Sequence, residues 1–306
     1  YVIKSVTITN YLGESVKITL AEDDPEHGMI ISSITGLGPP KANVSMTDLA
    51  TMDGSLFNSA RVEKRNITIH MFFTFAPTIE DARHNTYKYF PIKKNLKFLI
   101  ETDNRIVETD GVVETNEPDI FSKQESNQIS LICSDPYLYS AGENGTNVTV
   151  FFGIEPLFEF AFSNESLTEP LLEFGSIENE TEKTIYYDGD SEIGVTITIH
   201  AIGDAGNITI YNTGTREVMK IYNSKIAALT GSGIIAGDDI IISTVRGNKY
   251  ISLLRGGIYT NILNALDKES DWFQLTKGDN IFAYTADEGA ENLQFKIENR
   301  IIYEGV

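Results

Sequence analysis

The stretch Ile129–Ser140 reads ISLICSDPYLYS and lies near the middle of a chain of 306 residues. Up to Cys133, residues on alternate positions are apolar, which is typical of a β-strand with one buried face. Pro136 has no amide hydrogen to donate and disfavours a helical conformation at Asp135, so we expect the strand to end at this turn. The polar run that follows, Ser140-Ala-Gly-Glu-Asn-Gly-Thr146, predicts a flexible linker.

Length and charge support a division at this point. Since domains typically contain about 100–200 residues, we predict one domain over residues 1–140 and a second over residues 141–306, each with its own core. The formal net charge is −20, with 13 basic against 19 acidic residues in 1–140 (−6) and 11 against 25 in 141–306 (−14). Such an acidic chain is not expected to bind duplex DNA tightly or to dock on anionic lipid.

The first domain is predicted to be mostly β with one α-helix. Thr78 and Asp81 form a capping-box pattern, and Pro91 stops the helix that they begin. Residues Ile79, Ala82, Tyr87 and Phe90 are expected on its buried side. The predicted strands are Lys4–Thr9, Ser15–Leu20, Met29–Thr35, Arg65–Phe75, Leu96–Glu101, Arg105–Val113 and Gln128–Cys133.

The second domain shows short strands separated by turn residues, a pattern that indicates an all-β sandwich. The predicted strands are Thr184–Tyr187, Val195–Ala201, Asn207–Tyr211, Glu217–Tyr222, Asp239–Val245, Lys249–Leu254, Asn280–Tyr284 and Asn292–Ile297. Trp272, the only tryptophan, is followed by Phe273. We expect this pair to close one end of the core rather than to form a platform for sugar.

Residues 36–60 are rich in Gly, Pro, Ser, Asn and Asp and form a long irregular segment. Loops of this length inside a domain are usually functional or disordered. Asp53-Gly54 at its centre is a turn signal that fits a hairpin tip. Arg61 and Arg65 flank Lys64 where the segment ends. These cations either pair with carboxylates of a neighbouring copy or simply begin a solvated strand, and the sequence favours neither reading.

No recognisable catalytic or metal-binding set is present. The four histidines, His27, His70, His84 and His200, fall in different predicted elements without ligand spacing. The sequence contains no nucleophile elbow, phosphate-binding loop or zinc-protease motif. The acid pairs Asp188/Asp190 and Asp238/Asp239 sit in turns that contain glycine, where solvated turn acids are expected rather than a glycosidase dyad. We therefore predict no catalytic residue, no cofactor and no metal.

The single cysteine and the hydropathy pattern exclude other classes. Cys133 cannot form a disulfide within the chain and is expected to be a small buried hydrophobic residue. The first residues lack the pattern of a signal peptide, and no run of 18 apolar residues occurs, so no membrane-spanning segment is expected.

Several motifs follow one another in a distinctive order. They are Gly36-Leu-Gly-Pro-Pro40, Asp53-Gly54, the strand led by Arg65, the helix that stops at Pro91, the turn Asp135-Pro-Tyr137, and the closing runs Leu275–Phe282 and Ile301–Val306. In order and spacing they resemble the distal tail proteins of long-tailed bacteriophages that infect Gram-positive bacteria. One departure is Ser134, where that family often has a proline.

The resemblance implies a structural protein of the virion, assembled in the host cytoplasm and located at the tail tip. It would form a homohexameric ring that joins the tail-tube protein to a tail-associated hub or lysin protein and holds receptor-binding or other baseplate proteins. The first domain would be a tube-like β-sandwich or split barrel whose long loop embraces the next subunit. The second would be a galectin-like β-sandwich. No enzymatic activity is implied.

Two site predictions accompany this reading. The subunit interface is expected to include Asp53, Gly54, Arg61 and Arg65. Phage DNA would pass through the ring without specific binding, and an acidic wall would favour this by repelling phosphate. The channel-lining acids are predicted to be Glu108, Asp110 and Glu114, in or beside a turn at Gly111.

Two other classes remain as alternatives. The first is a carbohydrate-binding module, in which the second domain recognises polysaccharide on the host cell surface. The second is an enzyme of polysaccharide breakdown. A hexamer in solution would favour the ring former, and glycan binding by the isolated second domain would favour the carbohydrate-binding module.

Overall fold

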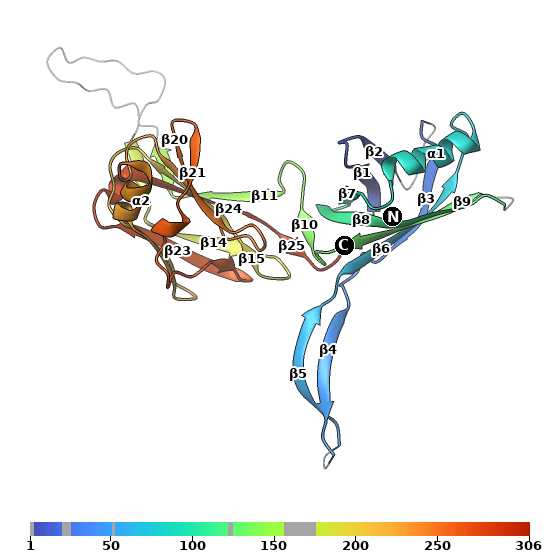
Figure 1. Ribbon diagram of the computed structural model, residues 1–306, viewed down its shortest axis with the longest axis horizontal. Coiled ribbons are helices and arrows are strands. Elements are labelled where there is room, and N and C mark those ends of the chain that lie inside the picture. Colours follow the sequence, from blue (N-terminus) through green and yellow to red (C-terminus); the bar gives the residue numbers. More distant parts are fainter. Residues whose placement is uncertain (1–2, 20–25, 51–52, 122–124, 156–175) are drawn as a thin grey trace. The chain divides into compact units, whose positions relative to one another are not determined.

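The computed structural model describes residues 3–19, 26–50, 53–121, 125–155 and 176–306. It is mostly β, as predicted (Figure 1). The chain divides into two compact units, the first made of residues 1–145 and 301–306 and the second of residues 146–300. The expected boundary at residue 140 lies close to this division. The last six residues, expected in the second domain, belong instead to the first unit.

Nine of the described strands of the first unit form an antiparallel sheet. Its main path has the order β2-β1-β7-β8-β9-β6-β3, and β25 pairs with β10, which pairs with β8. Their bounds are β1 (Ile3–Thr9), β2 (Ser15–Thr19), β3 (Met29–Thr35), β6 (Arg65–Phe73), β7 (Asn95–Thr102), β8 (Ile106–Asp119), β9 (Ser126–Cys133), β10 (Leu138–Ser140) and β25 (Ile302–Tyr303). The inward residues of these strands form one apolar core.

Helix α1 (Ile79–Tyr89) begins with the predicted capping box, in which the Asp81 amide donates to Thr78 Oγ1 at 3.2 Å. Its buried residues include Ala82, Thr86 and Tyr89, which lie four and three residues apart on one face. Tyr87 is 44% exposed, so its predicted place on the buried side was wrong.

Strand β8 is continuous through Gly111, where a turn was predicted. A Cβ at Gly111 would lie 3.1 Å from Sγ of Cys133, so glycine here permits close packing against β9. Cys133 itself is 1% exposed, which confirms the prediction of a buried hydrophobic residue.

Most of residues 36–60, predicted to be irregular, forms an antiparallel hairpin of β4 (Ala42–Asp48) and β5 (Ser55–Val62). Every described side chain in both strands is exposed. Figure 1 shows the hairpin standing away from the sheet of its own unit, and we refer to it as the arm.

The second unit contains two larger sheets that form a β-sandwich. The six-stranded sheet has the order β11 (Thr146–Val150), β24 (Leu293–Arg300), β16 (Thr196–Ala201), β19 (Asp239–Ser243), β20 (Tyr250–Arg255), β21 (Ile258–Asn261). The four-stranded sheet has the order β14 (Glu182–Tyr187), β23 (Gly278–Ala286), β17 (Ile208–Asn212), β18 (Glu217–Ile221). Across the core, the rings of Tyr284 and Phe295 stack with centroids 3.7 Å apart.

Smaller elements complete this unit. They are the strand pairs β12 (Phe152–Glu155) with β13 (Ser176–Asn179) and β15 (Ile193–Gly194) with β22 (Gln274–Leu275), helix α2 (Asn223–Thr230), and the 3₁₀ turns η1 (Leu263–Ala265) and η2 (Ala290–Asn292). The sequence pattern did not predict α2. Phe273 is buried edge-to-face against Phe282, with ring centroids 5.4 Å apart, while Trp272 is half-buried.

The predicted linker 140–146 is more ordered than its composition suggested. Ser140 belongs to β10 and is 6% exposed. Its hydroxyl donates to the Gly145 carbonyl and accepts from the Ile301 amide at 2.8 Å. Ser140 therefore links residue 145, where the chain leaves the first unit, to Ile301, where the chain returns to it.

Because residues 301–306 belong to the first unit, we expect the second domain to fold alone without them. A fragment of residues 146–300 should be soluble, monomeric and cooperative in thermal melting, because it contains all the described strands of the sandwich. The longer fragment 146–306 adds six residues whose partners are absent, so its melting temperature should be the same within about 1 °C. Calorimetry on both fragments tests this; an unfolded 146–300 fragment would contradict the division.

Candidate subunit interface

The arm is amphipathic because of its register. In an antiparallel pair, residues directly opposite each other share a face. Ala42 pairs with Val62, Val44 with Ala60, and Met46 with Phe57. These six apolar residues therefore lie on one face, which we call the apolar face of the arm. Val44, Met46 and Phe57 are 45%, 59% and 60% exposed.

The opposite face of the arm is mostly polar. Asn43 pairs with Arg61 and Ser45 with Ser59. A register shift between Ser45 and Met46 leaves Asn58 without a pairing partner on the opposite strand, and its Nδ2 donates to Oγ1 of Thr47 at 2.7 Å. This bulge places Phe57 and Ser59 on opposite faces, although they are two residues apart. Leu56, 56% exposed and paired with Thr47, is the exception on the polar face.

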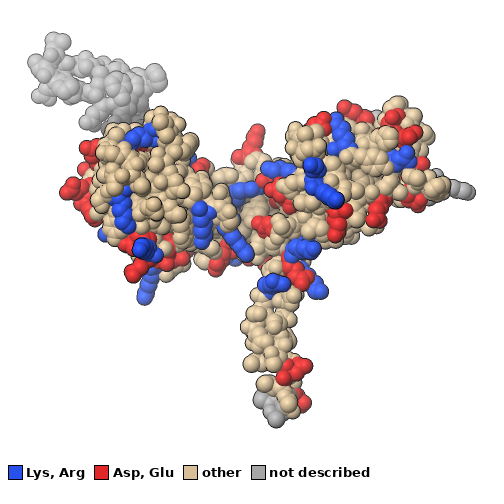
Figure 2. Space-filling view, in the orientation of Figure 1, with Lys and Arg blue, Asp and Glu red and all other residues tan. Residues whose placement is uncertain are grey.

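Charge is concentrated at the two ends of the arm. Figure 2 shows a middle region without charged side chains, a root where basic side chains outnumber acidic ones, and an acidic tip. The root carries Lys41, Arg61 and Lys64 beside a single acid, Glu63, and so is net positive. The tip carries Asp48 and Asp53. Such a gradient suits a head-to-tail contact, in which one copy presents its arm to a complementary surface of the next.

The predicted interface residues fall in two groups. Asp53, Gly54 and Arg61 are exposed on the arm, Gly54 with φ of 97° at its tip. Their role in a subunit contact stays a prediction. Arg65 is 2% exposed at the first position of β6. Its guanidinium is used inside its own subunit, so we remove it from the candidate interface.

The sequence-based prediction missed the apolar face and selected charged residues and the glycine at the tip instead. Apolar side chains at residues 42, 44 and 46 do alternate as in a strand, which was a usable signal. The bulge at Asn58 breaks the same alternation in β5, and this hid the second half of the face.

The three predicted channel acids lie on β8. Glu108 and Asp110 are two residues apart and share a face. The Glu108 carboxylate lies 3.4 Å from Nζ of Lys97, and Glu114 accepts a hydrogen bond of 3.0 Å from Ser130. The structure thus places Glu108 and Asp110 on the same face of β8. Their predicted place on a channel wall stays a prediction.

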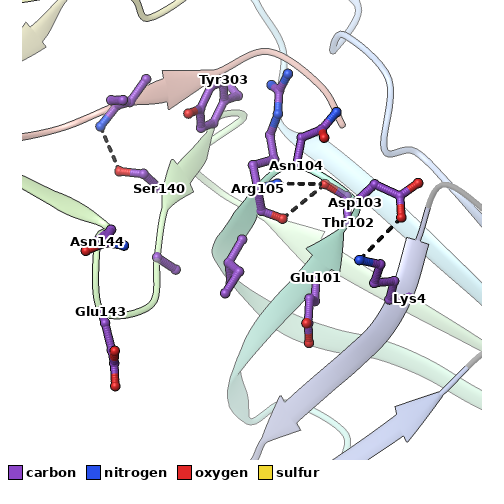
Figure 3. Close-up of a pocket in the computed structure, with 13 residues that line it drawn as sticks. Lys4, Glu101, Thr102, Asp103, Asn104, Arg105, Ser140, Glu143, Asn144 and Tyr303 are labelled. Atoms are coloured by element: carbon purple, nitrogen blue, oxygen red, sulfur yellow. Dashed lines mark hydrogen bonds and ion pairs between the residues drawn. The ribbon is translucent and has the colours of Figure 1, made fainter.

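A pocket of about 560 Å³ in the first unit lies beside the turn between β7 and β8 (Figure 3). Lys4 Nζ is 3.4 Å from Asp103, and the Arg105 guanidinium lies 4.6 Å from the centre of the Tyr303 ring. These side chains are therefore engaged with one another within the first unit.

The part of the chain that the structure describes shows no metal site and no membrane-spanning helix. There, no group of three or more His, Cys, Asp or Glu residues is placed to hold a metal ion. No described helix is long and apolar enough to cross a membrane. His200 lies on the outer side of β16, with its Nδ1 2.7 Å from Asp239.

Comparison with solved structures identifies the fold. The crystal structure of the Dit protein of phage SPP1 matches 96% of this chain and 97% of its own, with a TM-score of 0.65 and 12% identity. The chain has the SPP1 Dit fold. SPP1 Dit is described as a paradigm of the hub adsorption apparatus in phages that infect Gram-positive bacteria. The likeness to SPP1 Dit confirms the fold expected from the sequence resemblance.

Weaker similarities exist to the baseplate of phage P2. Its activated conformation with Ca and with Sr matches 97% of this chain and 98% of the matched chain, at 9% identity and a TM-score of 0.47. No protein-family model and no curated protein matches the sequence.

Proposed function

We propose that this chain is a structural protein of a phage tail tip, a homohexameric ring at the distal end of the tail tube. The ring joins the tube protein to a hub or lysin protein and holds receptor-binding or baseplate components. It acts by assembly and not by catalysis. The observation that carries the proposal is the arm, an amphipathic hairpin whose apolar face is uncovered within one subunit.

The arm needs a partner for physical reasons. An isolated two-stranded hairpin is marginally stable in water. Apolar patches of this kind on soluble proteins usually mark interaction sites. A second copy of the chain is the partner that the charge gradient favours, because a basic root and an acidic tip on identical arms complement each other around a ring.

The mass of the purified protein in solution tests this proposal. One copy has a mass of 34.0 kDa. A ring of six copies should have a mass of about 204 kDa, six times that value, and images should show a closed ring with a central hole. A monomer at micromolar concentration would contradict the proposal. Glycan binding by fragment 146–300 would instead support the carbohydrate-binding module.

The channel of the proposed ring is expected to repel DNA. We predict that Glu108→Lys with Asp110→Lys turns a ring without affinity for duplex DNA into one that binds it. Each replacement exchanges a negative for a positive charge in every copy. Binding should weaken steeply with salt, since log K falls by about 0.9 per neutralised phosphate for each unit of log salt concentration.

The matched control reverses two acids in the second unit, Asp188→Lys with Asp190→Lys. This control makes the same change in net charge, but at the turn that follows β14 in the second unit. DNA binding measured between 50 and 200 mM salt should then stay near the level of the unmodified ring. Equal binding by both variants would contradict a channel role for Glu108 and Asp110.

A further inference from the structure

Arg65 ties together three segments that are distant in the sequence. Its Nε donates to the Pro136 carbonyl at 2.7 Å, and its Nη1 donates to the Gly36 and Gly38 carbonyls at 2.7 and 2.8 Å. Its Nη2 donates to the Glu304 carbonyl at 2.6 Å. The side chain thus contacts residues 36–38, which lead into the arm and which we include in its root. It also contacts the turn after β9 and the segment that returns to the first unit.

The root of the arm is held tightly at this point. Gly36 has a φ of 86°, and a Cβ there would lie 1.9 Å from the Asn66 carbonyl oxygen. The Val306 amide donates to the Leu37 carbonyl at 3.0 Å. A Cβ at Gly305 would lie 3.1 Å from the same oxygen. The returning segment is therefore packed directly against the backbone from which the arm extends.

Arginine is the side chain that fits this arrangement. Its planar guanidinium presents five N–H donors in a fixed fork, whereas lysine offers a single compact ammonium. Burial lowers the pKa of Arg65, but arginine stays protonated in proteins. Carbonyl dipoles from three segments therefore stabilise its charge inside the unit.

We propose that Arg65 is the positioning residue for ring closure: it fixes the direction in which the arm leaves its subunit, and so the number of copies at which the ring closes. This inference rests on the proposed ring. A head-to-tail contact closes only when the rotation between neighbours divides a full turn, about 60° for six copies. An arm whose root can pivot still binds the next copy, but at a variable angle.

The test compares Arg65→Lys with the unmodified protein. The variant keeps the buried charge but cannot reach all three segments. The Arg65→Lys protein should still associate through the arm. Its assemblies should, however, be a mixture of rings with different numbers of copies and of open chains. We expect the fraction of closed rings of one size to fall about tenfold, the effect of ~1.4 kcal/mol. Native mass spectrometry and single-particle images measure both quantities.

Arg255→Lys is the matched control. Arg255 lies in the second unit and likewise donates to a carbonyl, that of Gly233, and to the Asp238 carboxylate. It lies far from the arm in the sequence and does not belong to its unit. This variant should lose stability but keep rings of one size.

Val306→Pro is a second variant that leaves Arg65 intact. It removes the amide that donates to Leu37 and so loosens the arm root from the returning segment. It should broaden the distribution of ring sizes in the same way as Arg65→Lys.

The outcomes separate the two proposals. A monomeric unmodified protein would refute the ring itself. Uniform rings of unchanged size in Arg65→Lys and Val306→Pro would overturn the role of Arg65 while leaving the ring in place. If Arg65→Lys fails to fold, Val306→Pro decides the question.

Discussion

Replacing Met46 and Phe57 together by aspartate should convert the ring into folded monomers. The two side chains face each other across the arm and are 59% and 60% exposed in one subunit. Full burial of such side chains is worth about 1.5–3 kcal/mol each. A loss of ~4 kcal/mol per contact corresponds to about a thousandfold weaker association. Analytical ultracentrifugation of the double variant measures the outcome.

The matched control places the same charges on the other face of the same arm. Ser45→Asp with Ser59→Asp also introduces two acids at directly opposed positions. Any cost of like charges across the strands is therefore common to both variants. The control should stay a ring. Rings that survive the Met46 and Phe57 changes, or monomers from the serine control alone, would show that the apolar face is not the contact surface.

Asp238→Ala should be the most destabilising substitution of an acid in the second unit. Asp238 was predicted to be a solvated turn acid, and this was wrong, since it is 1% exposed. Its carboxylate accepts from Arg255 at 2.7 and 2.6 Å and from the Ile235 amide at 3.0 Å. This hydrogen bonding raises the pKa of Arg255. The pair joins the loop before β19 to the end of β20.

Removing the carboxylate leaves the guanidinium without its counter-charge. Breaking a buried pair in this way costs about 3–5 kcal/mol, and we expect ~3 kcal/mol because Arg255 is partly exposed. The melting temperature of the second unit should fall by roughly 6–12 °C. Calorimetry of fragment 146–300 avoids the contribution of the ring.

The neighbouring acid supplies the control for this prediction. Asp239→Ala removes a carboxylate that contacts His200 at 2.7 Å and whose side chain is 31% exposed. Partly solvated pairs contribute about 0–1 kcal/mol, so the melting temperature should change by less than about 4 °C. Equal effects of the two substitutions would mean that Asp238 is not the anchor of this loop.

The two neighbouring acids show where sequence reading fails. Both lie within two residues of Gly237 and have the same local signal. Their difference arises because Arg255, seventeen residues later, folds back over one of them. Whether a charged side chain is buried depends on the groups that surround it in the folded protein, and the neighbouring sequence does not reveal these groups.

The sequence alone determined features that depend on neighbouring residues. Alternation of apolar side chains located β1, β3 and β9, and the Thr78–Asp81 pair located the start of α1, because strand periodicity and helix capping act over a few residues. The same local signals, in their order, pointed to the fold that the comparison with SPP1 Dit bears out.

The tertiary structure alone decided the features that depend on distant contacts. It joined residues 301–306 to the first unit, enclosed Arg65 between three segments and paired the strands of the arm. These contacts link residues up to 239 positions apart. Their free energy comes from burial and hydrogen bonding between partners that no short window of sequence contains. The apolar face of the arm follows from the same cause, since only the cross-strand register brings its residues together.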